Sequence, residues 1–150
     1  MKVKDLMTTN ITCIREDTSI SQIALQMKKD DIGCIPVCDD MDNLKGIVTD
    51  RDIVLRAVAK NHYDDNEARD TERLTSKDIM TIDPVTVPPE MSIHDAALLF
   101  SAHRIRRLPV VESCKIVGML SLGDLASKPV YIDEAGDALS AISITDGMQG

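Results

Sequence analysis

The chain has 150 residues and a formal net charge of −8 at pH 7. This length is enough for one domain, and a content of one Phe, two Tyr and no Trp makes its expected core aliphatic and rich in methionine. The acidic charge argues against nucleic-acid binding and against an anionic membrane surface. The sequence has no apolar run long enough to span a bilayer and no apolar signal segment, so we expect a cytoplasmic protein.

The first half of the chain predicts a strand, a helix, two further strands and a second helix. An extended segment over 11–14 comes first. Ser19-x-x-Gln22 then predicts a capping box for a helix. Its buried stripe recurs at helical spacing in Ile20, Ile23, Ala24 and Met27. A hairpin over 35–49 follows. The second helix has its apolar face at Ile53, Val54, Ala57 and Val58.

The second half repeats this pattern. Lys4-Asp5-Leu6-Met7-Thr8 returns as Lys77-Asp78-Ile79-Met80-Thr81. An extended segment over 85–87, a helix beginning after Ser92 and a hairpin over 108–121 follow in the same order. A tandem repeat of this length indicates two copies of one supersecondary unit, each too small to bury its apolar face alone.

These patterns predict four parts of the chain. Residues 1–60 form the first repeat, 61–75 a charged connector and 76–127 the second repeat. Residues 128–150 form a C-terminal tail with a short helix, buried through Ala138, Leu139 and Ile142, and a disordered end.

The four cysteines have two interpretations. Their spacing and the positions of the three histidines do not fit a zinc site, and we predict no metal. Buried cysteines that act as small apolar side chains are one interpretation. The other is a Cys13–Cys38 bridge, because the two residues flank strands that should be neighbours. Reducing conditions in the cytosol argue against a permanent disulfide.

Each hairpin ends in the same pattern of glycine, two apolar residues, a hydroxyl residue and, three residues later, an acid. The two copies of this pattern are Gly46…Thr49-x-x-Asp52 and Gly118…Ser121-x-x-Asp124. A hydroxyl residue and an acid at this spacing are typical of a helix N-cap. A carboxylate there could equally accept hydrogen bonds from the two hydroxyls of a ribose. The pattern leaves both interpretations open.

These segments resemble a known family. Gly33-Cys34-Ile35-Pro36-Val37-Cys38-Asp39 and the Gly46–Asp52 pattern resemble the two signature segments of a CBS domain, the regulatory module of the cystathionine-beta-synthase type. The second copy, from Arg106 to Glu112 and from Gly118 to Asp124, matches more loosely. The whole chain resembles small stand-alone bacterial proteins that consist of one CBS pair, called a Bateman module.

The resemblance implies an α+β fold, in which two βαββα units pack through their sheets with pseudo-twofold symmetry. It also implies that adenosyl ligands bind in clefts between the repeats. The expected ribose contacts are Thr49, Asp52, Ser121 and Asp124. The expected base pocket comprises Ile11, Thr12, Ile35, Pro36, Val85, Thr86, Leu108 and Pro109.

The resemblance places phosphate-binding residues at Arg106 and Arg107, in the one basic cluster of an acidic sequence. The alternative is a solvated helix end whose cations oppose the helix dipole. The first copy has Gly33-Cys34 at these positions, so we expect phosphate to favour the second copy. Leu122-Gly123 replaces Asp50-Arg51, which makes the second ribose site the less certain one.

The sequence therefore predicts a non-catalytic regulatory module and no required cofactor. Its expected ligand is AMP, ADP, ATP, S-adenosylmethionine or NAD(H), and its expected partners are a second copy of the chain and an unknown effector protein. The alternatives are a ligand-free interaction scaffold and a redox-responsive stress protein. An enzyme is disfavoured because the sequence has no catalytic triad, glycine-rich phosphate loop or metal cluster.

Overall fold

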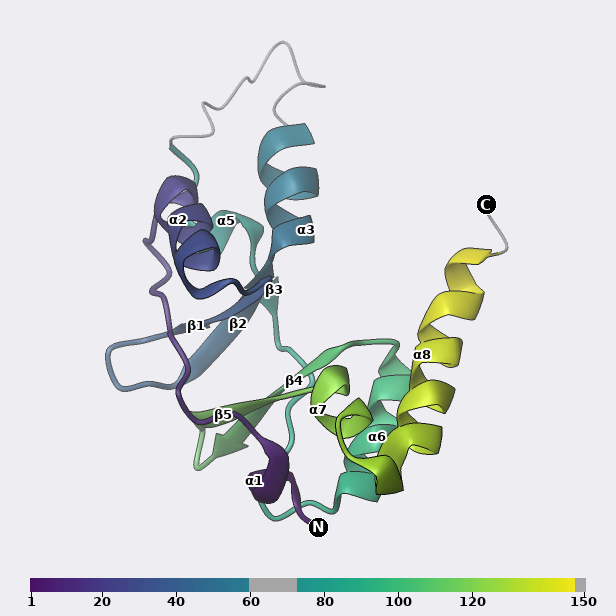
Figure 1. Cartoon of the computed structure of the whole chain (residues 1–150). Coiled ribbons are helices and arrows are strands. Elements are labelled where there is room, and N and C mark those ends of the chain that lie inside the picture. The colour runs from purple at the N-terminus through teal and green to yellow at the C-terminus, as the bar shows by residue number, and fades with distance from the viewer. Residues whose placement is uncertain (60–72, 148–150) are drawn as a thin grey trace. The chain divides into compact units, whose positions relative to one another are not determined.

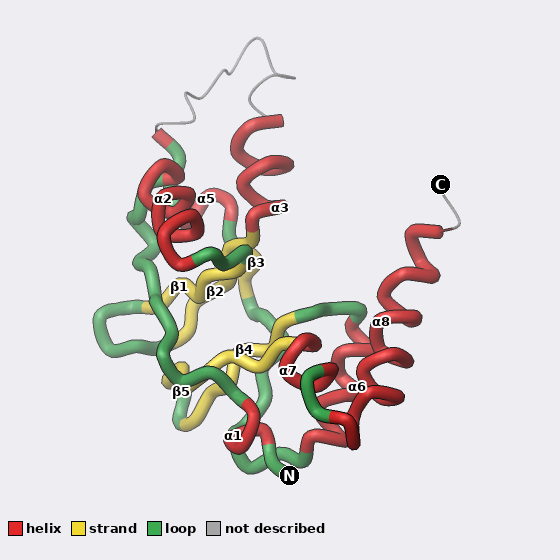
Figure 2. Tube along the Cα trace, in the orientation of Figure 1, coloured by secondary structure: helices red, strands yellow, loops and turns green. Residues whose placement is uncertain are grey.

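The computed structural model describes residues 1–59 and 73–147 and divides the chain into two compact units. Unit 1 comprises Met1–Ile11 with Val85–Gly150, and unit 2 comprises Thr12–Pro84. Both units mix helices with a small sheet (Figures 1 and 2). Residues 60–72, which include most of the predicted connector 61–75, lie outside the described residues.

Unit 2 packs helices against a three-stranded antiparallel sheet of order β1-β2-β3. Its elements are α2 (Ile20–Asp30), β1 (Cys34–Cys38), β2 (Leu44–Thr49), α3 (Asp50–Asp52), the π-helical segment η1 (Ile53–Ala59), α5 (Ser76–Ile79) and β3 (Thr81–Ile82). The predicted capping box forms, because Ser19 Oγ accepts a hydrogen bond from Gln22 N at 3.2 Å and Gln22 Oε1 accepts one from Ser19 N at 3.3 Å. Of the predicted stripe, Ile20, Ile23 and Met27 are buried, whereas Ala24 is exposed.

Unit 1 packs helices against the two-stranded antiparallel sheet β4-β5. Its elements are α1 (Val3–Leu6), α6 (Ile93–His103), β4 (Arg107–Glu112), β5 (Lys115–Ser121), α7 (Leu122–Ala126), the 3-10 turn η3 (Pro129–Tyr131) and α8 (Ile132–Gly147). Phe100, the only phenylalanine, is fully buried in its core. The hairpin turn is Ser113-Cys114, and both residues have positive φ, as a tight two-residue turn requires.

Each unit combines one repeat with the opening segment of the other repeat. In unit 1, Val3 N donates to Met91 O at 2.8 Å, and Val3 is fully buried. In unit 2, Ser76 N donates to Thr18 O at 2.9 Å, and β3 adds to the edge of β2. The compact units therefore differ from the predicted parts 1–60 and 76–127, because each opening segment finds its hydrogen bonds and apolar contacts on the other repeat.

The two leading strands that the sequence predicts are reduced to single bridges. Ile14 pairs in parallel with Val37, and Val87 pairs in parallel with Val110. Each bridging residue makes two backbone hydrogen bonds to its strand, and residues beyond it make no ladder. In the second repeat, the next ladder donor after Val87 would be residue 89, which is a proline without an N–H.

The last helices differ from the prediction in length and burial. In η1 Ala57 is buried, whereas Val54 is 57% exposed and Val58 is 44% exposed. The expected short C-terminal helix is α8, whose 16 residues reach Gly147. Residues 145–147 are therefore helical, and residues 148–150 of the predicted tail lie outside the described residues.

Of the predicted buried positions in α8, Ala138 is buried and Ile142 packs against the core of unit 1. Leu139 is 46% exposed and lies at the edge of the face that Ala135 and Ala138 bury. Among the helices of residues 1–59 and 73–147, none is long and apolar enough to cross a membrane.

Candidate functional site

The hydroxyl–acid pattern forms the same reciprocal capping box at the end of each hairpin. In unit 2, Asp52 N donates to Thr49 Oγ1 at 3.1 Å, and Thr49 N donates to Asp52 Oδ2 at 2.9 Å. In unit 1, Asp124 N donates to Ser121 Oγ at 3.1 Å, and Ser121 N donates to Asp124 Oδ2 at 2.8 Å. The cap interpretation is therefore confirmed, and it occupies one oxygen of each carboxylate.

The second carboxylate oxygen distinguishes the two copies. Asp52 Oδ1 lies 3.6 Å from Arg56 Nε, one helical turn further on, and the Asp52 side chain is only 12% exposed. Asp124 Oδ1 makes no hydrogen bond or ion pair within the described part of the chain. Because a carboxylate has two acceptor oxygens, the cap leaves Asp124 able to accept hydrogen bonds from a ligand hydroxyl.

The two arginines of the second repeat lie beside its capping box. Arg107 is the direct cross-strand partner of Ser121 in the β4–β5 ladder. The carbonyl oxygen of Arg106 accepts from Leu122 N at 3.0 Å, at the first residue of α7. Both side chains are exposed, and Arg107 Nη1 donates to Arg106 O at 3.2 Å. The structure thus brings the predicted phosphate and ribose residues of this copy together.

The equivalent place in unit 2 carries the opposite charge. Gly33 O accepts from Asp50 N at 3.0 Å, the same backbone contact that Arg106 makes. A Cβ added at Gly33 would lie 3.0 Å from Asp50 Oδ2. A carboxylate therefore lies next to the backbone position that corresponds to Arg106, so the unequal charge predicted for the two copies extends to the surrounding side chains.

The predicted base-pocket residues separate into backbone and core positions. Ile35 and Leu108 are fully buried in the cores of unit 2 and unit 1, so their side chains contribute to packing. The carbonyls of the neighbouring prolines accept from the leading segments, Pro36 O from Ile14 N and Pro109 O from Val87 N, both at 3.0 Å.

The remaining base-pocket residues divide between the units. Thr12 belongs to unit 2, while Ile11, Val85 and Thr86 belong to unit 1. Thr12 Oγ1 donates to Asp30 Oδ2 at 3.2 Å, at the end of α2.

Sequence reasoning missed two residues of this region. Arg56 approaches Asp52 and also donates through Nη1 to Ile79 O at 3.1 Å, so it connects the acid to the end of α5. Its i,i+4 spacing from Asp52 was a usable signal. Asp50 was noted only as a difference between the repeats. Its approach to Gly33 depends on the backbone path between β1 and α3, which no local pattern reveals.

Comparisons with known proteins show which family the chain resembles. The CBS domain family model matches residues 3–58 and 77–131. The CBS domain-containing protein YhcV of Bacillus subtilis is 40% identical over 141 residues, which cover 94% of each chain. The crystal structure of CBSX2 in complex with AMP has a TM-score of 0.72 and 26% identity, and the match covers 88% of this chain and 98% of that one.

A further solved structure carries two adenosyl ligands. The CBS domain pair of protein MJ0100, in complex with 5′-methylthioadenosine and S-adenosyl-L-methionine, has a TM-score of 0.73 and 26% identity. That match covers 85% of this chain and 94% of that chain. With two family matches over most of its length, the chain belongs to the CBS domain family and has the fold of a tandem CBS pair.

Proposed function

We propose that the protein is a non-catalytic regulatory module that binds an adenosyl ligand through its two hairpin-end boxes and signals the ligand's presence to an effector protein. One observation carries the proposal. Both repeats hold an acid in the same fixed geometry, and Asp124 keeps one carboxylate oxygen without a partner among the described residues. A prearranged acceptor of this kind suits the vicinal hydroxyls of a ribose.

The relatives support the ligand class. CBSX2 binds AMP, and the MJ0100 pair binds 5′-methylthioadenosine and S-adenosyl-L-methionine. These compounds share the adenosine group and differ in the charge attached to its 5′ carbon. Because Arg106 and Arg107 lie beside the Ser121–Asp124 box, we assign a phosphate-bearing adenosine to the second repeat. In the first repeat, the negative charge of Asp50 would repel a phosphate group.

The proposed assembly is a homodimer. In η1 three aliphatic side chains remain uncovered, Val54 at 57%, Leu55 at 48% and Val58 at 44% exposure. Apolar side chains grouped on one helix are typical of a contact surface, and a second copy would cover them through an isologous interface. Light scattering should show a dimer at micromolar concentration. Val58→Asp should shift it to monomer, while Leu98→Asp on α6, equally exposed at 56%, should not.

The ligand test is a thermal shift of the full chain with AMP, ADP, ATP, S-adenosylmethionine, NAD and adenosine, followed by calorimetry of each compound that stabilises it. We expect at least one adenosine compound to raise the melting temperature, and guanosine compounds at equal concentration to have no effect. If none of the adenosine compounds binds, the interaction-scaffold alternative replaces the proposal.

A further inference from the structure

Two cysteines of unit 2 lie in direct contact. Cys38 Sγ and Cys13 Sγ are 3.2 Å apart, and neither is in a disulfide. Cys38 is buried within β1, and Cys13 is partly exposed on the segment that leads to Ile14. A disulfide bond is about 2.05 Å long, so the sulfur atoms need to approach by only about 1 Å.

The backbone holds the two thiols opposite each other. Ile14 N donates to Pro36 O at 3.0 Å, and Cys38 N donates to Ile14 O at 2.8 Å. These two bonds form the parallel bridge that replaces the predicted leading strand. They fix the residue that follows Cys13 against the residue that precedes Cys38. Bringing the two sulfur atoms within bonding distance therefore requires side-chain rotation more than backbone movement.

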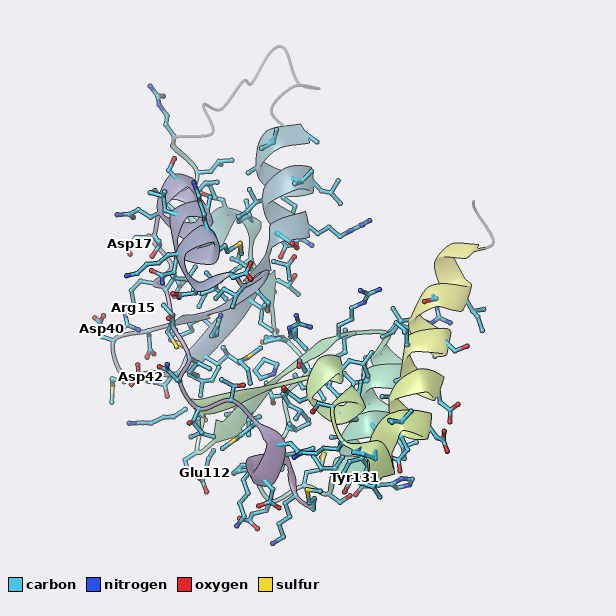
Figure 3. All side chains as sticks on the ribbon, viewed as in Figure 1. Arg15, Asp17, Asp40, Asp42, Glu112 and Tyr131 are labelled. Carbon is cyan, nitrogen blue, oxygen red and sulfur yellow. The ribbon has the colours of Figure 1, made fainter. Side chains whose placement is uncertain are left out.

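The environment gives the two thiols different reactivity. The hydrogen bond that Cys38 donates lowers the pKa of the Cys13 thiol and raises the pKa of the Cys38 thiol. The Arg15 guanidinium also favours the Cys13 thiolate, while the Asp42 carboxylate opposes it. Figure 3 shows Arg15 beside Asp40 and Asp42, to which it is paired at 3.7 and 3.9 Å. Cys13, the more exposed and more acidic thiol, is therefore the attacking sulfur.

We propose that Cys13 and Cys38 are a redox modification site, at which a hydroperoxide forms a reversible disulfide within unit 2. The Cys13 thiolate attacks one peroxide oxygen, the O–O bond breaks, and Cys13 becomes a sulfenic acid while the other oxygen leaves as hydroxide or alkoxide. The Cys38 sulfur then attacks the Cys13 sulfur, the S–O bond breaks, and the hydroxyl leaves with the Cys38 proton as water. The two sulfurs lose two electrons in total, and the peroxide gains them.

A disulfide would add a covalent restraint to the segment that carries Thr12. Cys13 follows Thr12 directly, so the covalent bond would fix this predicted base-pocket position to β1. We expect the oxidised protein to bind adenosine compounds with an affinity several-fold different from that of the reduced protein. This consequence rests on the proposed function, whereas the formation of the disulfide does not.

The experiment uses the full chain with Cys114→Ser, which removes the exposed thiol of the β4–β5 turn and with it a route to intermolecular bridges. The reduced protein is treated with a small excess of hydrogen peroxide, its free thiols are counted, and its peptides are mapped by mass spectrometry. We expect two of the three thiols to be lost, a 13–38 linked peptide, and full recovery with dithiothreitol. Cys34→Ser in the same background is the matched control and should still form the bridge.

Cys13→Ser and Cys38→Ser should abolish the linked peptide. The Cys38→Ser protein should accumulate a sulfenic acid at Cys13 that dimedone traps, because the resolving thiol is absent. A linked peptide that contains Cys34, or sulfinic acid without any 13–38 bridge in a folded protein, would overturn the proposal. If the bridge forms and adenosine affinity is unchanged, only the proposed consequence for ligand binding is lost.

Discussion

The sulfur of Met80 lies 2.8 Å from the position that a Cβ on Gly46 would occupy, and the Thr81 carbonyl oxygen lies at 2.7 Å from it. The second repeat has the same relationship, with Met7 Sδ at 2.7 Å from a Cβ on Gly118. Each methionine comes from the opening segment of one repeat and covers the hairpin glycine of the other. The glycine of the hairpin-end pattern therefore makes room for the exchanged segment.

Alanine at either glycine should destabilise the protein. We expect Gly46→Ala and Gly118→Ala each to lower the free energy of unfolding by about 1–3 kcal/mol, because the added methyl group forces a packed methionine to move. Urea unfolding of the full chain measures this. Gly136→Ala is the control, since a Cβ there meets nothing within 4 Å and α8 should gain about 0.5–1 kcal/mol.

Double-mutant cycles should show that removing the methionine relieves the two glycine substitutions to different extents. Removing Met7 relieves the nearest contact of a Cβ at Gly118, where the carbonyl of Thr8 is 3.0 Å away. Removing Met80 leaves the closer Thr81 carbonyl at 2.7 Å, so Gly46→Ala should be relieved less. Equal coupling energies in the two cycles would contradict this account.

The hairpin-end acids should control ligand binding more than stability. Asp52→Ala and Asp124→Ala should each weaken one site by roughly one to two powers of ten, since a charge-assisted hydrogen bond contributes about 1.5–3 kcal/mol. The lost cap should cost only about 1 kcal/mol of stability. Calorimetry with the ligand found by thermal shift measures the first effect, and urea unfolding measures the second.

The control for the lost hydrogen bond is Gln22→Ala, which removes the equivalent side-chain acceptor in α2, where Ser19 N donates to Gln22 Oε1. It should lower stability by a similar amount and leave affinity unchanged. Asp124→Asn keeps an oxygen for the cap but removes the charge, so it should lose affinity and keep stability. Unchanged binding in the Asp52→Ala, Asp124→Ala double variant would mean that the motif is a cap alone.

The repeat, the buried face of α6, most of the buried face of α2, both hairpins and the capping boxes could be predicted because each depends on residues close in sequence. The exchange of the opening segments could not be predicted. Lys4–Thr8 and Lys77–Thr81 are so alike that the sequence pattern does not show which of them packs on which hairpin. The length of α8 was missed because Gly136 and several polar residues weaken its amphipathic pattern. Asp50 was missed because its neighbour Gly33 is brought close only by the fold.

Glu90 should make stability depend on pH in the acid range. Lys2 and Lys4 lie 2.5 and 2.7 Å from its carboxylate oxygens, and their hydrogen bonds lower the pKa of Glu90 to about 2. A carboxyl group whose pKa is lower in the folded state stabilises the fold above its unfolded pKa, near 4.5, and loses this as pH falls toward 2.

The comparison of wild type with Glu90→Gln isolates this contribution. Melting temperatures should differ by a small, constant amount above about pH 5 and converge as the pH falls toward 2. The difference should also shrink in 1 M salt, because all three side chains are about half exposed. A difference that persists unchanged at pH 2 would show that Glu90 acts through packing and not through its charge.

Arg106 and Arg107 should select for phosphate. In the Arg106→Ala, Arg107→Ala double variant, we expect affinity for AMP, ADP or ATP to fall by tenfold or more, given about 1.5–3 kcal/mol for a charged hydrogen bond. Adenosine, or S-adenosylmethionine if it binds, should change little because neither offers a phosphate. Calorimetry at two salt concentrations measures this, and high salt should reduce the difference, since both side chains are exposed.

The matched control is Lys28→Ala with Lys29→Ala, which removes two positive charges from the last turn of α2 in unit 2. If it weakens ATP binding as much as the arginine variant does, the effect comes from net charge and not from the place beside Ser121. Equal losses for adenosine and ATP in the arginine variant would mean that the arginines shape the site instead of binding phosphate. If the arginine variant loses affinity only for phosphate compounds, and the lysine control does not, the anionic ligand is assigned to the second repeat. Arg107 is paired with Ser121 in that repeat, whereas Asp50 lies against Gly33 in the first.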